Sequence, residues 1–150
     1  MTDSILYARE GALARLTFNR PAFLNAMDFD MGRRWRDLAH EVTQDPEVGA
    51  IILDAAGPAF CAGGDVVAMA SSGAGGDAVT ETAHVIHDGI RTFVESDKPI
   101  VAAVQGAVAG GGLGLMLTAD YIVAADRAKF VSKYANIGLT PDLGVSTLLT

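Results

Sequence analysis

Hydrophobic and polar residues alternate along the first part of the chain. The alternation covers residues 5–9 and 12–18, and Glu10-Gly11 between them is a turn pair, so the pattern predicts a β-hairpin. Over residues 28–43 the apolar residues recur every three or four positions instead. This period predicts an amphipathic helix that ends before Pro46.

The remaining pattern alternates apolar runs, which predict strands, with amphipathic or glycine-bounded stretches, which predict helices. In chain order we expect a strand at 48–53, a short helix at 66–70, a helix at 78–95, a strand at 100–104, a helix at 110–119, strands at 121–125 and 129–131, and a long helix starting at Thr140-Pro141-Asp142. Residues 71–77 (SSGAGGD) are expected to form a mobile surface loop. Strands alternating with helices predict an α/β protein in which residues 1–150 form one core domain.

Composition limits the classes of partner. A net charge of −7 argues against nucleic acid or an anionic membrane as the main partner. Residues 100–116 are nearly uncharged, but three consecutive glycines at 110–112 favour a strand, a loop and a short helix over a membrane span. The single Cys61 excludes an internal disulfide, and no apolar signal segment follows the polar residues 1–4, so a cytoplasmic location is predicted.

Two glycine-rich segments each follow a predicted strand. They read FCAGGD at 60–65 and QGAVAGGGLG at 105–114. Glycine tolerates positive φ and lets backbone N–H groups approach a ligand closely. Tight strand-to-helix turning would also explain either loop alone. The pair favours an oxyanion hole, in which two N–H groups stabilise one negatively charged oxygen.

Four stretches together resemble the crotonase, or enoyl-CoA hydratase/isomerase, superfamily. They are NRPAFLNAMD (19–28), FCAGGDV (60–66), PIVAAVQGAVAGGGLGLMLTADYIVAADRAKF (99–130) and IGLTPDLG (137–144), in the family's order and spacing. The resemblance implies a β-β-α spiral (the ClpP/crotonase fold) that binds acyl-CoA thioesters and stabilises an enolate. It also implies C-terminal helices that residues 1–150 lack, and a homotrimer or hexamer.

The resemblance further implies particular site residues. The oxyanion donors fall on the backbone N–H groups of Ala62 and Gly111. The substrate-binding positions are Ala22, Leu24, Ala26, Ala62, Gly63, Gly64, Asp65, Val66 and Tyr134. Coenzyme A is part of the substrate in this assignment, and neither a separate cofactor nor a metal is expected.

The chain departs from the hydratases of the family at both glutamates. Those positions are Gly114 and Tyr134, and the remaining acid is Asp142, as in the family's isomerases. Hydration uses two carboxylates, whereas a 1,3-proton shift needs one base. The resemblance therefore implies an isomerase rather than a lyase, acting in fatty acid metabolism with Asp142 as catalytic base. Thioester hydrolysis, dehalogenation and a non-catalytic acyl-CoA-binding subunit remain alternatives.

Most of the polar candidates also have a structural interpretation. Thr140-Pro141-Asp142 is a typical helix start, so Asp142 could cap a helix. Structural interpretations are favoured for the rest: a loop-shaping acceptor for Asp65, a junction acid for Asp120, surface or pocket-edge histidines for His84 and His87, and a small buried residue for Cys61.

Overall fold

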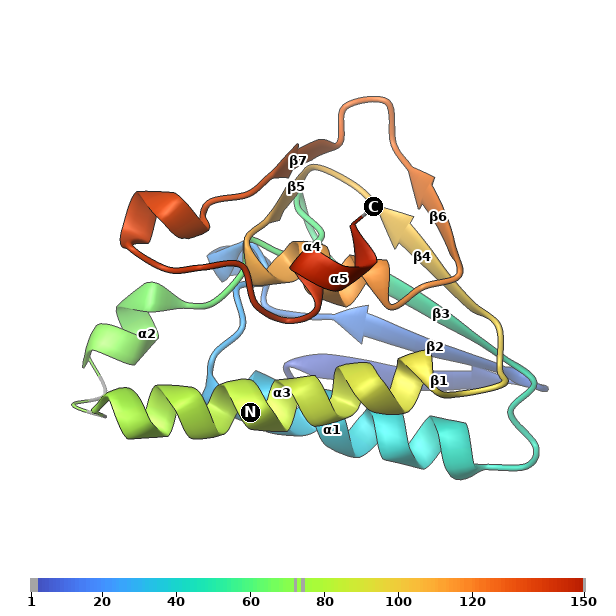
Figure 1. The fold of residues 1–150 in the computed structure, drawn as a ribbon. Helices are drawn as coiled ribbons and strands as arrows, with labels where there is room; N and C mark the ends of the chain where they lie inside the picture. Colours follow the sequence, from blue (N-terminus) through green and yellow to red (C-terminus); the bar gives the residue numbers. More distant parts are fainter. Residues whose placement is uncertain (1–2, 72, 74, 150) are drawn as a thin grey trace.

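The main sheet is mostly parallel and begins with a hairpin (Figure 1). The computed structural model describes residues 3–71, 73 and 75–149. The strand order is β1-β2-β3-β4-β6, with β1 and β2 antiparallel and the other neighbours parallel. The strands are β1 (Ile5–Glu10), β2 (Leu13–Phe18), β3 (Ala50–Ala55), β4 (Ile100–Val104) and β6 (Tyr121–Ala124). The predicted hairpin and α/β class are confirmed.

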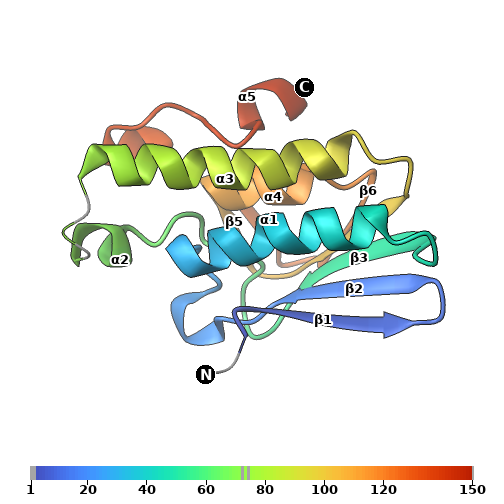
Figure 2. The same cartoon turned by 90° about the horizontal axis from the view of Figure 1, so that it is seen from below.

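Two long helices lie side by side on one face of this sheet (Figure 2). They are α1 (Phe29–Gln44) and α3 (Gly76–Val94). Helix α1 begins where predicted because the Asp28 carboxylate accepts the Met31 N–H at 2.8 Å. The ring of Trp35 on α1 contacts Phe18 of the sheet and Phe93 of α3, with centroids 5.9 and 4.8 Å away. This aromatic cluster joins sheet and helices into one core.

The second glycine-rich segment contains a strand that the sequence pattern did not reveal. Strand β5 (Ala107–Ala109) pairs in parallel with β7 (Lys129–Val131) in a second, two-stranded sheet. Helix α4 (Gly111–Leu117) follows β5 directly and is fully buried over residues 111–116. Three small residues between glycines are too short for a recognisable period, so the strand was expected to be loop.

The long helix predicted from Thr140 is wrong. The described chain has two short 3-10 turns, η1 (Pro21–Phe23) before α1 and η2 (Tyr134–Ile137) shortly before Thr140. In the described residues after η2, the helix is α5 (Val145–Leu148), which begins five residues later than predicted. Leu143 and Gly144 have φ values of +49° and +79°, so the backbone turns before α5 begins. The N-cap of α5 is Gly144, and Asp142 caps no helix.

Helix α2 (Val66–Ser71) and the start of α3 shorten the predicted loop at 71–77. Residues 72 and 74 of that loop lie outside the described residues. The mobility of the loop therefore stays a prediction.

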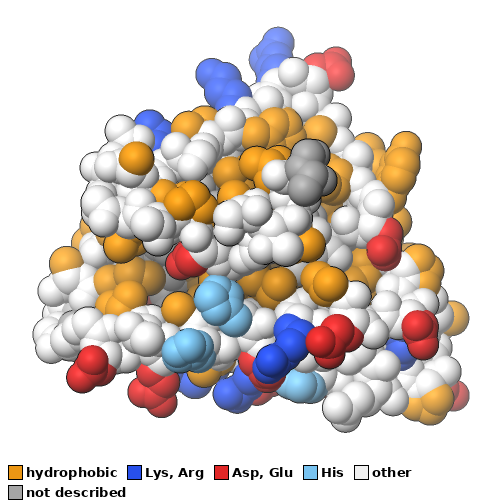
Figure 3. All heavy atoms as spheres, viewed as in Figure 1, with side chains coloured by type: hydrophobic (Ala, Val, Ile, Leu, Met, Phe, Trp, Pro, Cys, Tyr) orange, Lys and Arg blue, Asp and Glu red, His pale blue; other side chains and the backbone are white. Residues whose placement is uncertain are grey.

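Apolar side chains are exposed along the later strands. Tyr121 and Val123 on β6 are 68% and 55% exposed, and Phe130 on β7 is 48% exposed. Figure 3 shows hydrophobic side chains gathered on this face, above a lower edge rich in charged and histidine side chains. No helix in the described ranges is both long and apolar enough to cross a membrane. The expected trimer or hexamer stays a prediction, for which this apolar surface is suitable.

Gly106 offers a test of the turn that starts the second glycine-rich segment. Its φ is +61°, and a Cβ there would lie 1.9 Å from the Pro58 carbonyl oxygen. Gly11 has the same φ of +61° with no atom within 4 Å of its Cβ position. We expect Gly106→Ala to lower the free energy of unfolding by about 3 kcal/mol or more, against about 1 kcal/mol for Gly11→Ala. Urea unfolding of both variants checks this, and equal losses would contradict the clash.

Candidate active site

The two glycine-rich segments lie against each other through backbone hydrogen bonds. The Phe60 N–H donates to the Gln105 carbonyl at 2.8 Å, and the Ala109 N–H donates to the Cys61 carbonyl at 3.0 Å. Cys61 and Val108 thereby form a parallel bridge. The carboxyl ends of the parallel strands β3 and β4 bring both segments to the same edge of the sheet, as expected.

Glycine is required where these segments touch. A Cβ on Gly112 would lie 2.3 Å from the Cys61 carbonyl oxygen. Gly63 has a φ of +96°, and its Cβ would lie 2.7 Å from the Ala109 oxygen and 3.3 Å from the Gly111 nitrogen. These positions can hold no side chain without moving backbone, so the contact is made between bare main chains.

Several N–H groups at this contact are unpaired. Among them are those of Gly64 and Gly111, which have no acceptor within the described part of the chain. The Gly63 carbonyl accepts the Met27 N–H at 2.7 Å, so the trans peptide turns the Gly64 N–H the opposite way. Likewise the Gly110 carbonyl accepts the Leu113 N–H, which points the Gly111 N–H out of the start of α4. Both glycines line the same cavity.

The structure corrects one predicted oxyanion donor. The Ala62 N–H donates to the Leu24 carbonyl at 3.0 Å, so it is already used within the protein. Its partner Leu24 has a φ of +51° at the end of η1. Gly64, two residues further on in this loop, has an unpaired N–H group. A motif fixes where a loop lies in the sequence, but each peptide's orientation depends on its partners across space.

That same hydrogen bond brings the two predicted coenzyme A segments together. Residues 22–26 lie against residues 62–66, and the Asp65 N–H donates to the Met27 carbonyl at 2.9 Å. The fully buried Asn25 side chain donates to the carbonyls of Ala56 and Ala59 and anchors the connection. Ala22 and Leu24 are exposed beside this junction. Contact of these residues with coenzyme A stays a prediction.

Arg20 links the caps of two helices. Its Nη2 lies 3.0 Å from carboxylate oxygens of both Asp28 and Asp65, and its Nη1 donates to the Ala26 carbonyl. The Asp65 carboxylate accepts the Ala68 N–H at 2.9 Å and so shapes the start of α2, as expected. Burial opposes ionisation of Asp65, but hydrogen bonds from Ala68 and Arg20 outweigh it and hold its pKa below the ordinary value. Arg20 stands in the NRP stretch but is not among the site residues that the sequence predicts.

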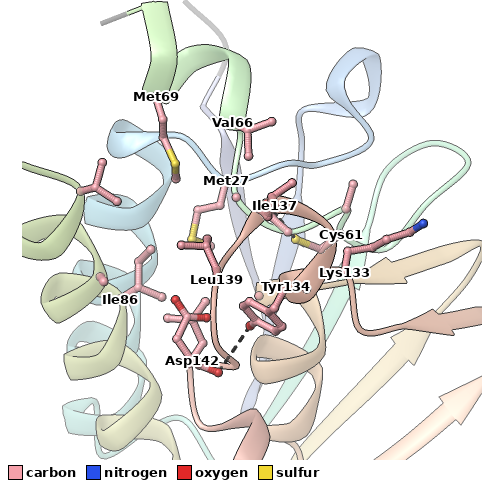
Figure 4. Close-up of a pocket in the computed structure, with 18 of the residues that line it drawn as sticks. Met27, Cys61, Val66, Met69, Ile86, Lys133, Tyr134, Ile137, Leu139 and Asp142 are labelled. Atoms are coloured by element: carbon pink, nitrogen blue, oxygen red, sulfur yellow. Dashed lines mark hydrogen bonds between the residues drawn. The ribbon is translucent and has the colours of Figure 1, made fainter. Parts of the chain in front are cut away.

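The glycine contact opens into a cavity of about 260 Å³ (Figure 4). The cavity takes residues from five parts of the chain, and its walls are mainly apolar. The labelled lining residues are Met27, Cys61, Val66, Met69, Ile86, Lys133, Tyr134, Ile137, Leu139 and Asp142. A cavity of this kind suits an apolar part of a ligand that is held next to a few polar atoms of the protein.

Asp142 is the acid in this cavity. Its Oδ1 is buried and has no hydrogen-bond partner among the described residues. Figure 4 shows its carboxylate directed toward the apolar lining, with the Tyr134 hydroxyl 3.4 Å from the Asp142 carbonyl oxygen. Burial raises the pKa of the Tyr134 phenol above its ordinary value, and Asp142 raises it further, so Tyr134 stays a neutral donor. Because the N-cap of α5 is Gly144, the alternative that Asp142 caps a helix is removed.

Leu143 occupies the space beside Gly114, where a family hydratase carries a glutamate. A Cβ on Gly114 would lie 2.1 Å from the Leu143 carbonyl oxygen and 2.7 Å from its Cβ. The Leu143 side chain also lies 2.6 Å from the Cβ position of Gly111. The segment that carries Asp142 therefore packs against a face of α4 that must be bare. Only the structure reveals this, because residues 114 and 143 are far apart in the sequence.

The remaining polar candidates have structural roles. The Asp120 carboxylate accepts the Ile100 N–H at 2.8 Å. Burial raises the pKa of the Cys61 thiol to about 11, which leaves it unreactive. Among the described residues, no three acidic, histidine or cysteine side chains gather in a way that could hold a metal. The His87 Nε2 accepts the Leu143 N–H at 3.0 Å, a contact that the sequence did not reveal.

Comparison with known proteins agrees with the fold. Residues 8–150 match the family described as Enoyl-CoA hydratase/isomerase. The chain is 37% identical to the mitochondrial 3-hydroxyisobutyryl-CoA hydrolase of Gallus gallus, over 95% of this chain and 38% of that protein. It is 32% identical to the 1,2-epoxyphenylacetyl-CoA isomerase of Escherichia coli K12, over 99% of this chain and 58% of that protein. An enoyl-CoA hydratase from Polaromonas sp. JS666 superposes with a TM-score of 0.88 at 32% identity, over 97% of this chain and 57% of that one.

An α/β fold with this pair of bare glycine loops defines a crotonase-type protein. The chain belongs to the enoyl-CoA hydratase/isomerase family. It spans 38–58% of the length of the three relatives above. Their names include a hydrolase, an isomerase and a hydratase, so family membership alone leaves the reaction open.

The Asp65 carboxylate predicts an acid-dependent loss of stability. Because its pKa is lower in the folded state, its contribution is present above the unfolded aspartate pKa of about 3.9 and is lost as the pH falls through the folded pKa. Wild type should therefore exceed Asp65→Asn in free energy of unfolding at pH 7, and the difference should shrink below about pH 4. Urea unfolding from pH 7 to pH 3 measures it, with the exposed Asp126→Asn as control. A difference that is constant with pH would contradict the role of the carboxylate.

Proposed function

We propose that this chain carries the acyl-CoA site of an enoyl-CoA isomerase with Asp142 as its single base. The observation that carries the proposal is the buried, unpaired Oδ1 of Asp142 in an apolar cavity that also receives the unpaired N–H groups of Gly64 and Gly111. The Oδ1 atom, which has no partner among the described residues, is available to a substrate proton. Two N–H groups in one cavity suit an oxygen that becomes negative.

The chemistry follows from this division of polar groups. The thioester carbonyl oxygen would accept hydrogen bonds from the Gly64 and Gly111 N–H groups. The Asp142 carboxylate removes a proton from the carbon α to that carbonyl, which lies between the carbonyl and the C=C bond, and the electron pair is delocalised to the oxygen as a dienolate. The protonated Asp142 then returns the proton to the other end of the allylic system. The C=C bond moves by one position, and no atom is gained or lost.

Hydration fits this site less well. It needs a second carboxylate to hold and activate water, and residue 114 is a glycine whose Cβ position is occupied by the Leu143 carbonyl. Residue 134 supplies a phenol whose raised pKa makes it a poor base. These two observations favour isomerisation over hydration.

Thioester hydrolysis is the second candidate, favoured by the 37% identity with the Gallus gallus hydrolase. In that reaction Asp142 would activate a water against the thioester carbonyl, and free coenzyme A would leave. Coenzyme A is part of the substrate in either reaction, so we propose no separate cofactor.

Asp142→Asn in the full-length protein is the direct test. Asparagine keeps the size of the side chain but cannot accept the proton, so we expect double-bond migration in a 3-enoyl-CoA to fall by about 100-fold or more. Ultraviolet absorbance of the conjugated product measures it, with release of free coenzyme A recorded in parallel. The exposed Asp97→Asn should keep the wild-type rate. An unchanged rate in Asp142→Asn excludes it as base, and release of coenzyme A without migration supports the hydrolase.

Gly114→Ala tests whether the bare face of α4 is needed by the segment that carries Asp142. A Cβ there clashes with the Leu143 carbonyl, so the segment must shift, and misplacement of a catalytic group by about 1 Å can cost about 100-fold in rate. We expect a fall in kcat of at least about tenfold. Gly76→Ala, at a site with no atom within 4 Å, is the control. Wild-type kcat in Gly114→Ala would show that the segment tolerates displacement.

A further inference from the structure

His87 of α3 reaches the peptide next to the proposed base. Its Nε2 lies 3.0 Å from the Leu143 nitrogen, and this N–H donates to it. His87 does not line the cavity, so it reaches the site only through the backbone of residues 142 and 143. An imidazole nitrogen that accepts a hydrogen bond carries no proton, so the bond requires the neutral form with the proton on Nδ1.

The peptide group between Asp142 and Leu143 is held at both of its ends. Its N–H donates to His87, while its carbonyl oxygen lies 3.4 Å from the Tyr134 hydroxyl and accepts the Val145 N–H at 3.0 Å. The contacts come from α3, η2 and α5, three separate elements. Rotation of this peptide plane would carry the Asp142 side chain with it.

The backbone here needs such support. Leu143 has a φ of +49°, which is unfavourable for a residue with a branched side chain, and such conformations persist only where the surroundings hold them. Its side chain is 7% exposed and packs against Gly111. Packing fixes where Leu143 lies, but a directional acceptor fixes which way its N–H points.

We infer that His87 is a positioning residue for Asp142, holding the 142–143 peptide through the Leu143 N–H so that the carboxylate stays directed into the cavity. The inference rests on the proposed role of Asp142. His84 offers a matched comparison, because it lies one turn earlier on α3, is exposed, and has no hydrogen bond to this segment in the described structure.

The test compares His87→Gln, His87→Leu and His84→Ala in the full-length protein. Glutamine retains an acceptor at similar reach, whereas leucine retains bulk without an acceptor. In His87→Leu we expect kcat for double-bond migration to fall by about tenfold or more with KM changed by less than about threefold, because the base is misplaced and not the binding walls. His87→Gln should recover most of the rate, and His84→Ala should match wild type. Wild-type kcat in His87→Leu would overturn the inference.

Two measurements test the anchor without relying on the reaction. Amide hydrogen exchange at Leu143 should accelerate in His87→Leu and stay at the wild-type rate in His84→Ala. In the wild-type protein, imidazole nitrogen chemical shifts should show Nδ1 protonated and Nε2 bare, which needs no variant to fold. Unchanged exchange, or a protonated Nε2, refutes the anchor. Faster Leu143 exchange together with full activity of Asp142→Asn keeps the anchor and refutes the proposed base, so the two failures are distinguishable.

Discussion

The close approach of two bare stretches of backbone is the constraint on which the site depends. Residues 60–61 hydrogen-bond to residues 105–109, and Gly63, Gly106 and Gly112 have no room for a Cβ. This contact uses the N–H groups of Phe60, Cys61 and Ala109, while those of Gly64 and Gly111, which line the cavity, stay unpaired. The proposed oxyanion site thus consists of backbone N–H groups that take no part in hydrogen bonds within the protein, and it needs no functional side chain.

A second bare surface links the fold to the chemistry. Gly111 and Gly114 lie on the face of α4 against which Leu143 packs, and the segment that carries Asp142 follows from that packing. A carboxylate at residue 114 and the present course of residues 142–143 exclude each other, because both need the same volume. The absence of an acid at residue 114 and the position of Asp142 therefore depend on each other. Sequence comparison records them as two independent differences.

Periodicity and motifs predict much of this structure, and geometry across space supplies the rest. The hairpin and α1 follow from alternation and from the Asp28 cap, which are local signals. The helix expected at Thr140 fails because positive φ at Leu143 and Gly144, imposed by packing on α4, overrides a favourable capping sequence. Ala62 was assigned as a donor because the motif marks the loop, whereas the Leu24 carbonyl that occupies its N–H lies 38 positions earlier. Residue types near the site are predictable, but the direction of each peptide is not.

The polar atoms left unpaired explain why the surrounding structure is so strongly fixed. A buried carboxylate oxygen without a partner costs free energy, and so does a leucine in the left-handed region. Neither arrangement persists unless neighbouring contacts outweigh it. The Arg20 links hold the first glycine-rich segment, and the hydrogen bonds of His87, Tyr134 and Val145 hold the peptide beside Asp142. Unpaired groups in a well-packed, mainly apolar cavity need little reorganisation when a substrate arrives, which is the condition under which a single base and two N–H groups can stabilise an enolate.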